Sequence, residues 1–216
     1  MDWKRMKQDG TIKLFQYWNR LRDGRPAPRR TEVEPADIKG LLGDTFILES
    51  DLRGEAVFRL AGTRLCAMYG RELKGFAFSS LWRDRDRRMV ARLVRNVLTE
   101  QSVLVMCFEA ISRSGRQVPV ELLLLPLSGG EESRRALGVA TPADKPYWLG
   151  ADPVIDSALD SVRVVDPDRE TAFPLTRPAI DVPTLAPGEL PLDSSADAIA
   201  GIRRIRHLIV LPGGRT

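Results

Sequence analysis

The stretch Phe58–Trp82, FRLAGTRLCAMYGRELKGFAFSSLW, decides which fold this sequence predicts. Its first residues read as the end of a β-strand, and Gly62 breaks that strand. Two short helical turns follow, the first ending at Gly70 and the second at Gly75. Glycine adopts a positive φ at little steric cost, so it ends short helical turns readily. The pattern predicts a strand that leads into a compact helical cap over one face of a sheet, with room for a cavity beneath it.

The elements predicted on either side of this stretch complete an antiparallel sheet. A hairpin precedes the cap, and a long amphipathic helix over Asp84–Gln101 follows it. Two long strands come next, joined by a tight turn that contains Gly115 and is typical of hairpins. The five predicted strands are Thr45–Ser50, Glu55–Ala61, Val103–Ser112, Gln117–Leu127 and Arg135–Thr141.

The segment Thr63–Gly75, TRLCAMYGRELKG, resembles the PAS domain, in which a strand enters short helices at a motif of the type N-x-x-A-x-x-L-x-G-Y-x-x-x-E-L-x-G. The closest match is G-R-E-L-x-G, and Gly62-Thr63 stands where the motif often has Asn. Over residues 44–144 the order of predicted elements is that of the PAS fold. The resemblance implies an α+β domain with a five-stranded antiparallel sheet and helices on one face.

Further motifs resemble the single-domain PAS proteins found in alphaproteobacteria. They are W-x-x-L-R-x-G near the start, R-L-A-G-T-x-L, E-L-x-L-x-P-L and the Y-W-L-G that follows the last predicted strand. This resemblance covers the chain up to about Ser161. It implies a bacterial regulator in signal transduction.

An amphipathic helix predicted over Thr11–Arg22 supplies an apolar stripe. Both alternating sets of side chains in the two long strands are largely apolar, so both faces of the sheet must be covered. The helical cap can cover only one face, and the stripe has the size and character to cover the other. PAS-like proteins often dimerise through this helix and this face. The resemblance therefore implies a homodimer whose interface includes Leu14, Phe15, Trp18 and Leu21.

The chain divides into three predicted parts. Residues 1–43 hold the amphipathic helix, a basic proline-containing connector and a short helix over Glu34–Leu42. Residues 44–144 form the core. Residues 145–216 are expected to be extended and partly mobile, since they are rich in proline and acidic residues and show no sustained period. The aromatic pair Tyr147-Trp148 is expected to pack on the core.

Composition bounds the class of protein. The chain has 216 residues, of which 43% are hydrophobic and 29% charged, as in ordinary globular proteins. No apolar run approaches the roughly 20 residues of a membrane span, and no apolar stretch follows the basic start, so we expect a cytoplasmic protein. Two cysteines and one histidine are too few for a disulfide framework or a zinc cluster.

The charge distribution leaves one alternative function open. The net charge is +4, with basic residues at both ends and acidic residues in between. Basic ends are a feature of proteins that bind nucleic acids, but no nucleic-acid-binding motif accompanies them. The sequence also shows no Ser/His/Asp or Cys/His catalytic combination that its single histidine, His207, could complete. Asp84 and Asp86 read as the salt-linked start of a helix, so we expect no enzymatic activity.

The PAS resemblance raises the question of a cofactor, since such domains hold haem, flavin or small metabolites. Haem usually needs an axial histidine from the long helix, which has none. A light-sensing flavin site needs a reactive cysteine in an N-C-R-F-L-like turn, and Cys66 lies in a different context. We therefore expect neither haem nor flavin, and a small metabolite remains possible.

Candidate ligand-binding residues lie around the predicted cavity. Glu109 and Glu121 either point out from the strands or line the cavity and bind a polar ligand. The full set is Arg59, Met68, Trp82, Met89, Leu93, Cys107, Glu109 and Glu121. The sequence predicts a sensory or regulatory protein that binds a small ligand or a signalling protein and transmits its state through helix and dimer contacts. The alternative is an adaptor with a filled interior that binds only proteins.

Overall fold

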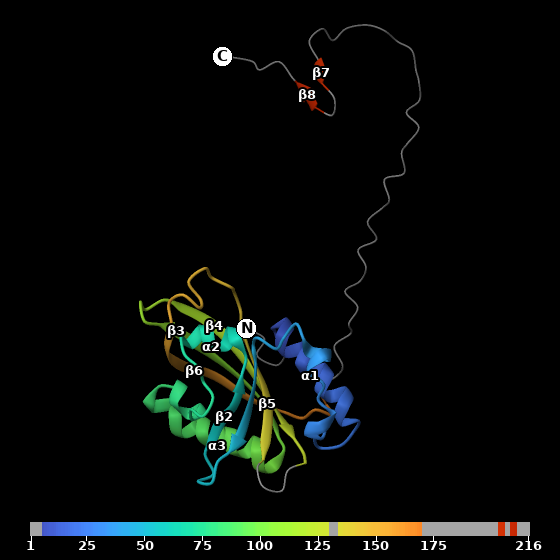
Figure 1. Cartoon of the computed structure of the whole chain (residues 1–216), viewed down its shortest axis with the longest axis vertical. Helices are drawn as coiled ribbons and strands as arrows, with labels where there is room; N and C mark the ends of the chain where they lie inside the picture. Colours follow the sequence, from blue (N-terminus) through green and yellow to red (C-terminus); the bar gives the residue numbers. More distant parts are fainter. Residues whose placement is uncertain (1–5, 130–133, 170–202, 206–207, 211–216) are drawn as a thin grey trace. The chain divides into compact units, whose positions relative to one another are not determined.

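The structure of the chain is a computed structural model, which describes residues 6–129, 134–169, 203–205 and 208–210. The chain forms two units, residues 1–173 and residues 174–216. The first unit contains a six-stranded antiparallel sheet in the order β2-β1-β5-β4-β3-β6. One face of this sheet carries α2, α3 and a 3-10 helix, and α1 lies on the other face (Figure 1).

The strands follow the predicted bounds closely. The alternation of inward and outward side chains in β1 and β2 and the apolar sequences of β3 and β4 explain why these segments extend. Their bounds are β1 Thr45–Ser50, β2 Ala56–Ala61, β3 Val103–Ser112, β4 Gln117–Leu127, β5 Arg135–Pro142 and β6 Val154–Val165. The first five are the predicted strands, and β6 is an addition to them.

Residues that favour helix ends mark the bounds of α2 and α3. The helix α2 stops at Gly70, which has φ +63° and donates its N–H to the last turn. In α3, Asp84 and Asp86 lie in the first turn, where carboxylates interact favourably with the helix dipole. The helices are α1 Asp9–Arg22, α2 Thr63–Tyr69 and α3 Asp84–Glu100, with 3-10 helices at Arg30–Glu32, Pro35–Ile38 and Phe78–Leu81. The helix predicted over Glu34–Leu42 is thus a shorter 3-10 turn that starts at Pro35.

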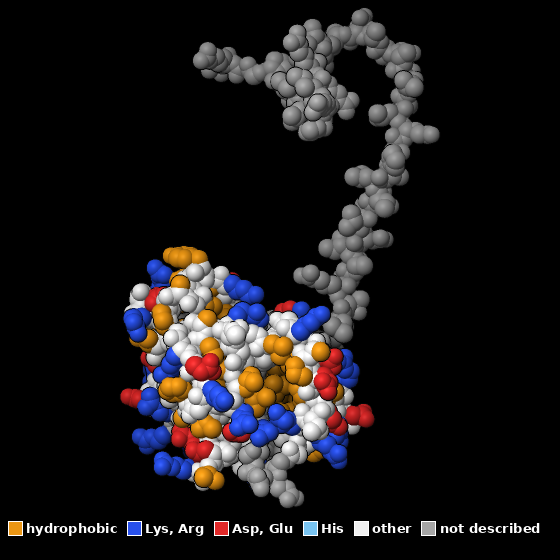
Figure 2. All heavy atoms as spheres, viewed as in Figure 1, with side chains coloured by type: hydrophobic (Ala, Val, Ile, Leu, Met, Phe, Trp, Pro, Cys, Tyr) orange, Lys and Arg blue, Asp and Glu red, His pale blue; other side chains and the backbone are white. Residues whose placement is uncertain are grey.

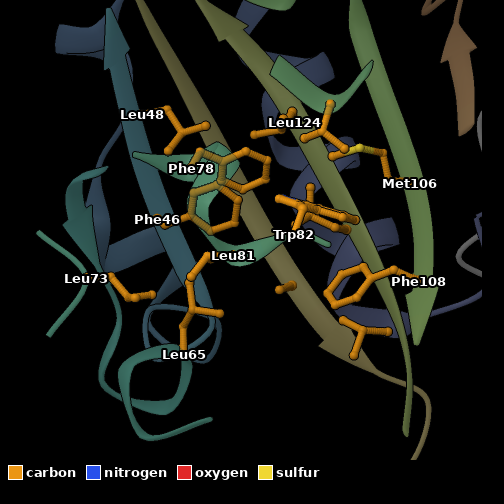
Figure 3. Close-up of a cluster of buried hydrophobic side chains, with 14 of the residues drawn as sticks. Phe46, Leu48, Leu65, Leu73, Phe78, Leu81, Trp82, Met106, Phe108 and Leu124 are labelled. Atoms are coloured by element: carbon orange, nitrogen blue, oxygen red, sulfur yellow. The ribbon is translucent and has the colours of Figure 1, made fainter. Parts of the chain in front are cut away.

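A hydrophobic core fills the space between the sheet and α3 (Figure 3). Aromatic rings from strands and cap contact one another in a chain, with centroid distances of 5.5 Å for Phe46–Phe58, 5.9 Å for Phe46–Phe78, 5.8 Å for Phe78–Trp82 and 4.9 Å for Trp82–Phe108. Such stacked, tilted and edge-to-face pairs are favourable beyond their buried area. Three aromatic residues of the stretch that predicted the fold, Phe58, Phe78 and Trp82, therefore lie at the centre of the core, whereas Phe76 is 44% exposed.

A second hydrophobic cluster lies between α1 and the opposite face of the sheet. Leu14 and Trp18 are 0% exposed, Phe15 is 3% exposed, and Leu21 is partly buried. The Trp18 indole also donates a hydrogen bond to the Pro126 carbonyl, at 2.8 Å. The apolar stripe of α1 therefore covers its own sheet, as the two-sided apolar strands require. In this conformation the chain's own sheet covers Leu14, Phe15 and Trp18 and part of Leu21, and the homodimer interface predicted for them stays a prediction.

The sixth strand corrects the prediction that residues 145–216 are extended and partly mobile. β6 pairs along β3 from Val103↔Val165 to Ser112↔Val154. Its sequence, VIDSALDSVRVV, alternates weakly between apolar and polar residues and stands between Pro153 and Pro167. A strand at the edge of a sheet tolerates polar side chains that a central strand would exclude, so this periodicity gave little signal. For residues 170–202, 206–207 and 211–216 the same prediction lies outside the described residues.

Hydrogen bonds fasten the first half of β6 to the helical cap. Arg83 donates its backbone N–H to the Ser157 carbonyl at 3.1 Å, and the Asp86 carboxylate accepts the Leu159 N–H at 3.0 Å. Ser157 also lies 3.1 Å from the Tyr69 hydroxyl. Just beyond β6, Asp168 accepts a hydrogen bond from the buried Arg22 guanidinium of α1, at 2.6 Å. The chain of residues 154–168 thus links the helices on the two faces of the sheet.

Two further expectations are corrected by burial. The apolar face of α3 consists of Val90, Val94, Val97 and Leu98, while Met89 is 42% exposed. Trp148 packs on the core as predicted, but Tyr147 is 87% exposed. In the second unit, β7 (Arg203–Ile205) and β8 (Leu208–Val210) form an antiparallel hairpin.

Candidate functional site

A groove of about 940 Å³ opens between α1, residues 37–44, α2 and residues 140–150. Apolar side chains line part of it, including Ile38, Leu65, Met68 and Leu149. Charged side chains of both signs surround them: Lys13, Arg20, Arg64 and Lys145 against Asp9, Asp37, Asp44 and Asp144. We call this feature the α1–α2 groove. Figure 2 shows hydrophobic side chains gathered on the surface beside α1, with charged side chains of both signs around them.

Close backbone approaches build the walls of the groove. A Cβ atom at Gly10 would lie 2.5 Å from the Thr141 hydroxyl, so only glycine lets α1 approach the end of β5 so closely. A Cβ atom at Gly62 would lie 2.2 Å from the Leu42 carbonyl oxygen, which places the start of α2 directly on the 41–44 turn. Gly10 and Gly62 therefore allow α1 and α2 to lie close to the segments beside them, and these close contacts form the walls of the groove.

An ion pair holds the turn at one side of the groove. Arg64 of α2 donates to both carboxylate oxygens of Asp44, at 2.8 and 2.6 Å, and to the Gly40 carbonyl at 3.1 Å. The bidentate hydrogen bond to Asp44 raises the pKa of Arg64, against the opposing effect of burial. Arg64 is therefore a structural cation, whereas Lys145 is exposed and available to an occupant.

Glu121 anchors the beginning of α1 to the sheet. It lies on β4, is 4% exposed, and accepts hydrogen bonds from the backbone N–H groups of Lys7 and Gln8 at 3.0 to 3.1 Å. Thr11 donates its hydroxyl to the same carboxylate. A carboxylate at a helix N-terminus is stabilised by the unpaired N–H groups and the helix dipole. Of the two predicted possibilities, Glu121 points inward, but it binds α1 instead of lining the groove.

Two other predicted site residues lie on this same α1-facing side of the sheet. Cys107 is opposite Glu121 in the β3–β4 register, and Glu109 follows two residues later and is half-buried. Burial raises the pKa of the Cys107 thiol. A thiol with a raised pKa is a poor nucleophile near neutral pH. Neither residue reaches the groove or the interior beneath α3.

The interior beneath α3 is occupied by aromatic rings, and Trp82 lies at its centre (Figure 3). The Trp82 side chain is 2% exposed, and its indole N–H has no hydrogen-bond partner among the described residues. Leu93 is partly buried and packs against this core. Trp82 is therefore a core residue with one unsatisfied donor.

The structure scatters the remaining predicted residues. Met68 is the one member of the predicted set that lines the α1–α2 groove among the described residues. Arg59 projects from β2 on the side opposite to the buried Phe58, is exposed, and pairs with Glu49 at 3.6 Å. Met89 lies on the outer surface of α3. The structure does not bring these residues together around one cavity, and their role in ligand binding stays a prediction.

Sequence reasoning missed the α1 side of the groove. Gln16, Tyr17 and Arg20 line it, and the Tyr17 hydroxyl bonds the backbone of Glu34, accepting at 2.8 Å and donating at 3.3 Å. These residues occupy helical positions beside the buried stripe. The available signal was that Tyr17 has polar neighbours on its helical face, Lys13 four residues before it and Arg20 three residues after it.

Within residues 6–129, 134–169 and the second-unit hairpin, no three His, Cys, Asp or Glu side chains group as metal ligands. No helix in these same ranges is long and apolar enough to cross a membrane.

Comparison with known families adds the decisive observation, because the PAS domain family matches residues 6–141, which are more than half of the chain. This chain belongs to the PAS domain family. The match includes α1, the cap and the first five strands, as the sequence motifs indicated. A PAS domain is a sensory or regulatory module, and domains of this family are in general not catalytic.

Solved structures similar to this PAS domain include the LOV protein of Rhodobacter sphaeroides, with 15% identity, a TM-score of 0.39 and coverage of 53% of this chain and 71% of that one. A PAS domain from Colwellia psychrerythraea has 16% identity and a TM-score of 0.37 over 52% of this chain and 100% of its own. A single-substitution variant of the Rhodobacter LOV protein has 17% identity and a TM-score of 0.36, over 51% and 68%. No curated protein matches the sequence.

Proposed function

We propose that this PAS domain is a non-enzymatic regulatory protein that receives its input in the α1–α2 groove and transmits the bound state through α1. The supporting observation is that a single groove is lined by α1 and by the helical cap together. An occupant touches elements on both faces of the sheet at once. Binding that favours one placement of α1 shifts the population toward it.

The size and chemistry of the groove indicate the class of occupant. Its volume of about 940 Å³ lies at the upper end of the range for small-molecule sites. The apolar lining favours an occupant with a hydrophobic body, and exposed Arg20 and Lys145 favour an acidic group on it, whereas Lys13 is paired with Asp9 at 2.6 Å. The carboxylates of Asp37 and Asp144, which also line the groove, can bind basic groups of the occupant. A small amphipathic ligand and a short peptide segment of a signalling protein both meet these requirements.

A second proposal would place the ligand in the interior beneath α3, but that interior is filled by side chains. The rings of Phe46, Phe58, Phe78, Trp82 and Phe108 contact one another there. A ligand in that space must displace buried rings, whereas the groove is open already. This favours an adaptor-like PAS domain whose input reaches it from the surface. The alternative function, nucleic-acid binding, is supported only by the basic ends of the chain. A strongly salt-dependent affinity for DNA would favour it.

The test uses 8-anilinonaphthalene-1-sulfonate, an aromatic anion, as the probe and NMR of the tryptophan indole groups as the readout. Trp18 lies on the sheet-facing side of α1, outside the groove, so its indole signal reports on α1, and the Trp82 signal reports on the interior. We expect saturable binding that shifts the Trp18 signal and leaves the Trp82 signal unchanged.

A matched pair of variants makes this test specific. Ala67 is exposed on α2 and lines the groove, so Ala67→Trp fills it without changing the core. Met89→Trp adds the same side chain to the outer surface of α3. The first variant should abolish probe binding and the second should retain it. Binding that survives Ala67→Trp, or that shifts Trp82 alone, would place the input in the interior and overturn the proposal.

Homodimer formation also remains a proposal. The chain's own sheet covers Leu14, Phe15 and Trp18 and part of Leu21, so a dimer that uses this stripe requires α1 to leave its own sheet.

A further inference from the structure

A second cleft, of about 250 Å³, is lined by the 3-10 helix that starts at Arg30, by the end of β4 and the start of β5, and by the C-terminus of α3. Every charged side chain that lines it in the described part of the chain is an arginine: Arg30, Arg134 and Arg135. The other polar residues of its lining are neutral, namely Thr99, Gln101 and Ser128. We call this feature the arginine cleft. The α1–α2 groove, by contrast, is lined by both signs of charge.

Backbone hydrogen bonds fix the positions from which these arginines extend. The Arg30 N–H donates to the Ser128 carbonyl at 3.0 Å, and the Arg134 carbonyl accepts from the Ser50 N–H at 3.0 Å. Arg135 pairs with β1 on one side and with β4 on the other. A site whose charged groups extend from rigid elements loses less conformational entropy when a ligand binds. The cleft therefore holds three guanidinium-bearing residues at fixed backbone positions.

Two of the three guanidinium groups have no counter-charge. Arg30 and Arg134 are exposed, and neither side chain forms an ion pair or a hydrogen bond with any described residue. Arg135 is mostly buried, and its Nε lies 3.5 Å from the Glu49 carboxylate. Glu49 also pairs with Arg59, at 3.6 Å, so it offsets at most the charge of Arg135. Three guanidinium groups against this one carboxylate leave the cleft an excess charge of +2.

Capping of α3 does not account for these arginines. The carbonyl groups at the end of a helix attract cations, and the partial charge there is only about −0.5. Among the described residues, neither Arg30 nor Arg134 donates a hydrogen bond to a carbonyl of α3. The two guanidinium groups therefore remain free to bind an anion from solvent.

We propose that the arginine cleft binds a phosphate group, either free phosphate or the phosphate of a small ester. A phosphate ester carries a charge of about −1.5 to −2 near neutral pH, which matches the excess charge of the cleft. The guanidinium group donates two parallel hydrogen bonds to phosphate oxygens, a geometry that the ammonium group of lysine cannot reproduce. The Gln101 side chain is exposed and lines the cleft, so its amide can donate to a further oxygen.

The volume of the cleft limits the size of the ligand. Its 250 Å³ lies below the roughly 300 to 1,000 Å³ of sites for drug-sized molecules. Leu98 and Leu127 add a small apolar part to the lining. A phosphate group with a substituent of a few carbon atoms suits this space. The arginine cleft and the α1–α2 groove share none of their described lining residues, so the two proposals can fail independently.

The first experiment titrates the isotope-labelled full chain with inorganic phosphate and, separately, with glycerol 3-phosphate. The sodium chloride concentration is about 150 mM, which screens non-specific attraction. We expect saturable NMR shifts of the backbone amide signals of Thr99, Gln101 and Gly129, which line the cleft, and no shift for Ala67 in the α1–α2 groove. Sodium acetate at the same concentrations should produce no saturable shift.

The two titrations also distinguish the two sources of the phosphate group. Tighter binding of glycerol 3-phosphate would identify an organic ester as the ligand, and tighter binding of inorganic phosphate would identify free phosphate. Failure of both compounds to saturate these signals at about 20 mM, or saturation by acetate as well, would overturn the proposal.

The second experiment repeats the titration with single arginine variants. Arg30→Gln and Arg134→Gln each remove one unpaired guanidinium group, so each should weaken phosphate binding by about tenfold or more. Both side chains are exposed, so the melting temperature without phosphate should match that of the wild type. Arg53→Gln is the matched control, because Arg53 is exposed between β1 and β2 and lines a different cleft. This variant loses the same charge and should keep the wild-type affinity.

The pattern across the three variants decides the location of the phosphate. Equal weakening in all three would mean that general charge attraction is responsible. Unchanged affinity in both Arg30→Gln and Arg134→Gln would place the phosphate elsewhere. Either result would overturn the proposal.

The third experiment uses a short DNA duplex as a competitor, because a nucleic-acid backbone also presents phosphate groups. We expect the duplex, at the same concentration of phosphate groups, to leave the Thr99, Gln101 and Gly129 signals unshifted and glycerol 3-phosphate bound. Displacement of glycerol 3-phosphate by DNA, with a strong dependence on salt, would assign the cleft to nucleic acid and contradict a site for small phosphates.

Discussion

At the scale of single residues, Tyr69 links the stability of the domain to alkaline pH. Its side chain is buried, and its hydroxyl lies 3.1 Å from the buried Ser157 hydroxyl. Burial raises the pKa of Tyr69 to about 12 from an ordinary value of 10, against the lowering effect of the Ser157 hydrogen bond. The unfolded chain therefore releases this proton at lower pH than the folded chain does.

The sign of the effect follows from proton binding. Between pH 10 and pH 12 the unfolded state binds fewer protons at this tyrosine, so the free energy of unfolding falls as pH rises. The full contribution is present below pH 10 and amounts to about 2 to 3 kcal/mol. Urea unfolding at pH 9 and pH 11 should show about half of this loss in the wild type, because the loss is complete only above pH 12, and a smaller loss in Tyr69→Phe. Equal losses in both proteins would mean that Tyr69 is not the group responsible.

Trp82 and Met89 should respond very differently to truncation, although sequence reasoning placed both in the core. Trp82 is 2% exposed among aromatic rings, so Trp82→Ala should lower the free energy of unfolding by about 3 to 5 kcal/mol. Met89 is 42% exposed, so Met89→Ala should cost about 1 kcal/mol or less. Urea unfolding of the two variants in parallel checks the register of α3. Similar losses for both would place Met89 in the core after all.

At the scale of elements, Glu121 is the contact that should decide how firmly α1 is held. Glu121→Gln keeps the shape but loses the charge and turns an amide N–H₂ toward backbone donors. Hydrogen bonds to charged groups contribute about 1.5 to 3 kcal/mol, so α1 should open more often. Hydrogen exchange of the peptide covering residues 6–22 should accelerate, while exchange in α3 stays unchanged.

Glu109→Gln is the matched control for this prediction. Glu109 lies on the neighbouring strand and the same face of the sheet, and it makes none of the contacts described for Glu121. Exchange in α1 should match the wild type in this variant. If Glu121→Gln also matched the wild type, the anchor would have to be the apolar stripe alone.

The elements themselves were largely predictable, and the site was not. Five strands, α1, α2 and α3 followed from periodicity and from glycines such as Gly70, because these signals are local. β6 was missed because an edge strand carries polar side chains at positions that alternation reserves for apolar ones. The groove was missed because it depends on close approaches such as that of Gly10 to Thr141, which join residues distant in sequence.

At the scale of the whole molecule, the packed interior leads to a prediction about cofactors. The space beneath α3 is filled by aromatic side chains, and α3 contains no histidine. We expect the purified full-length protein to be colourless. Absorption between 350 and 600 nm that remains with the protein through gel filtration would contradict this. Reconstitution with haem or flavin serves as the control, and we expect it to leave no bound pigment.

The order of strands in the sheet also determines when the domain can fold. The hairpin β1–β2 and the meander β3–β4–β5 each form from neighbouring segments, but they join only through β1 and β5. Sheets that depend on such distant pairs fold slowly, on the order of milliseconds to seconds. During synthesis β1 therefore keeps an unpaired side until β5 has left the ribosome, and β3 keeps one until β6 follows. A nascent chain halted between β4 and β5 exposes the unpaired edge of β1 and the unpaired edge of β3 at the same time. The risk of aggregation in the cell is therefore greatest while the segment between β4 and β5 is being synthesised.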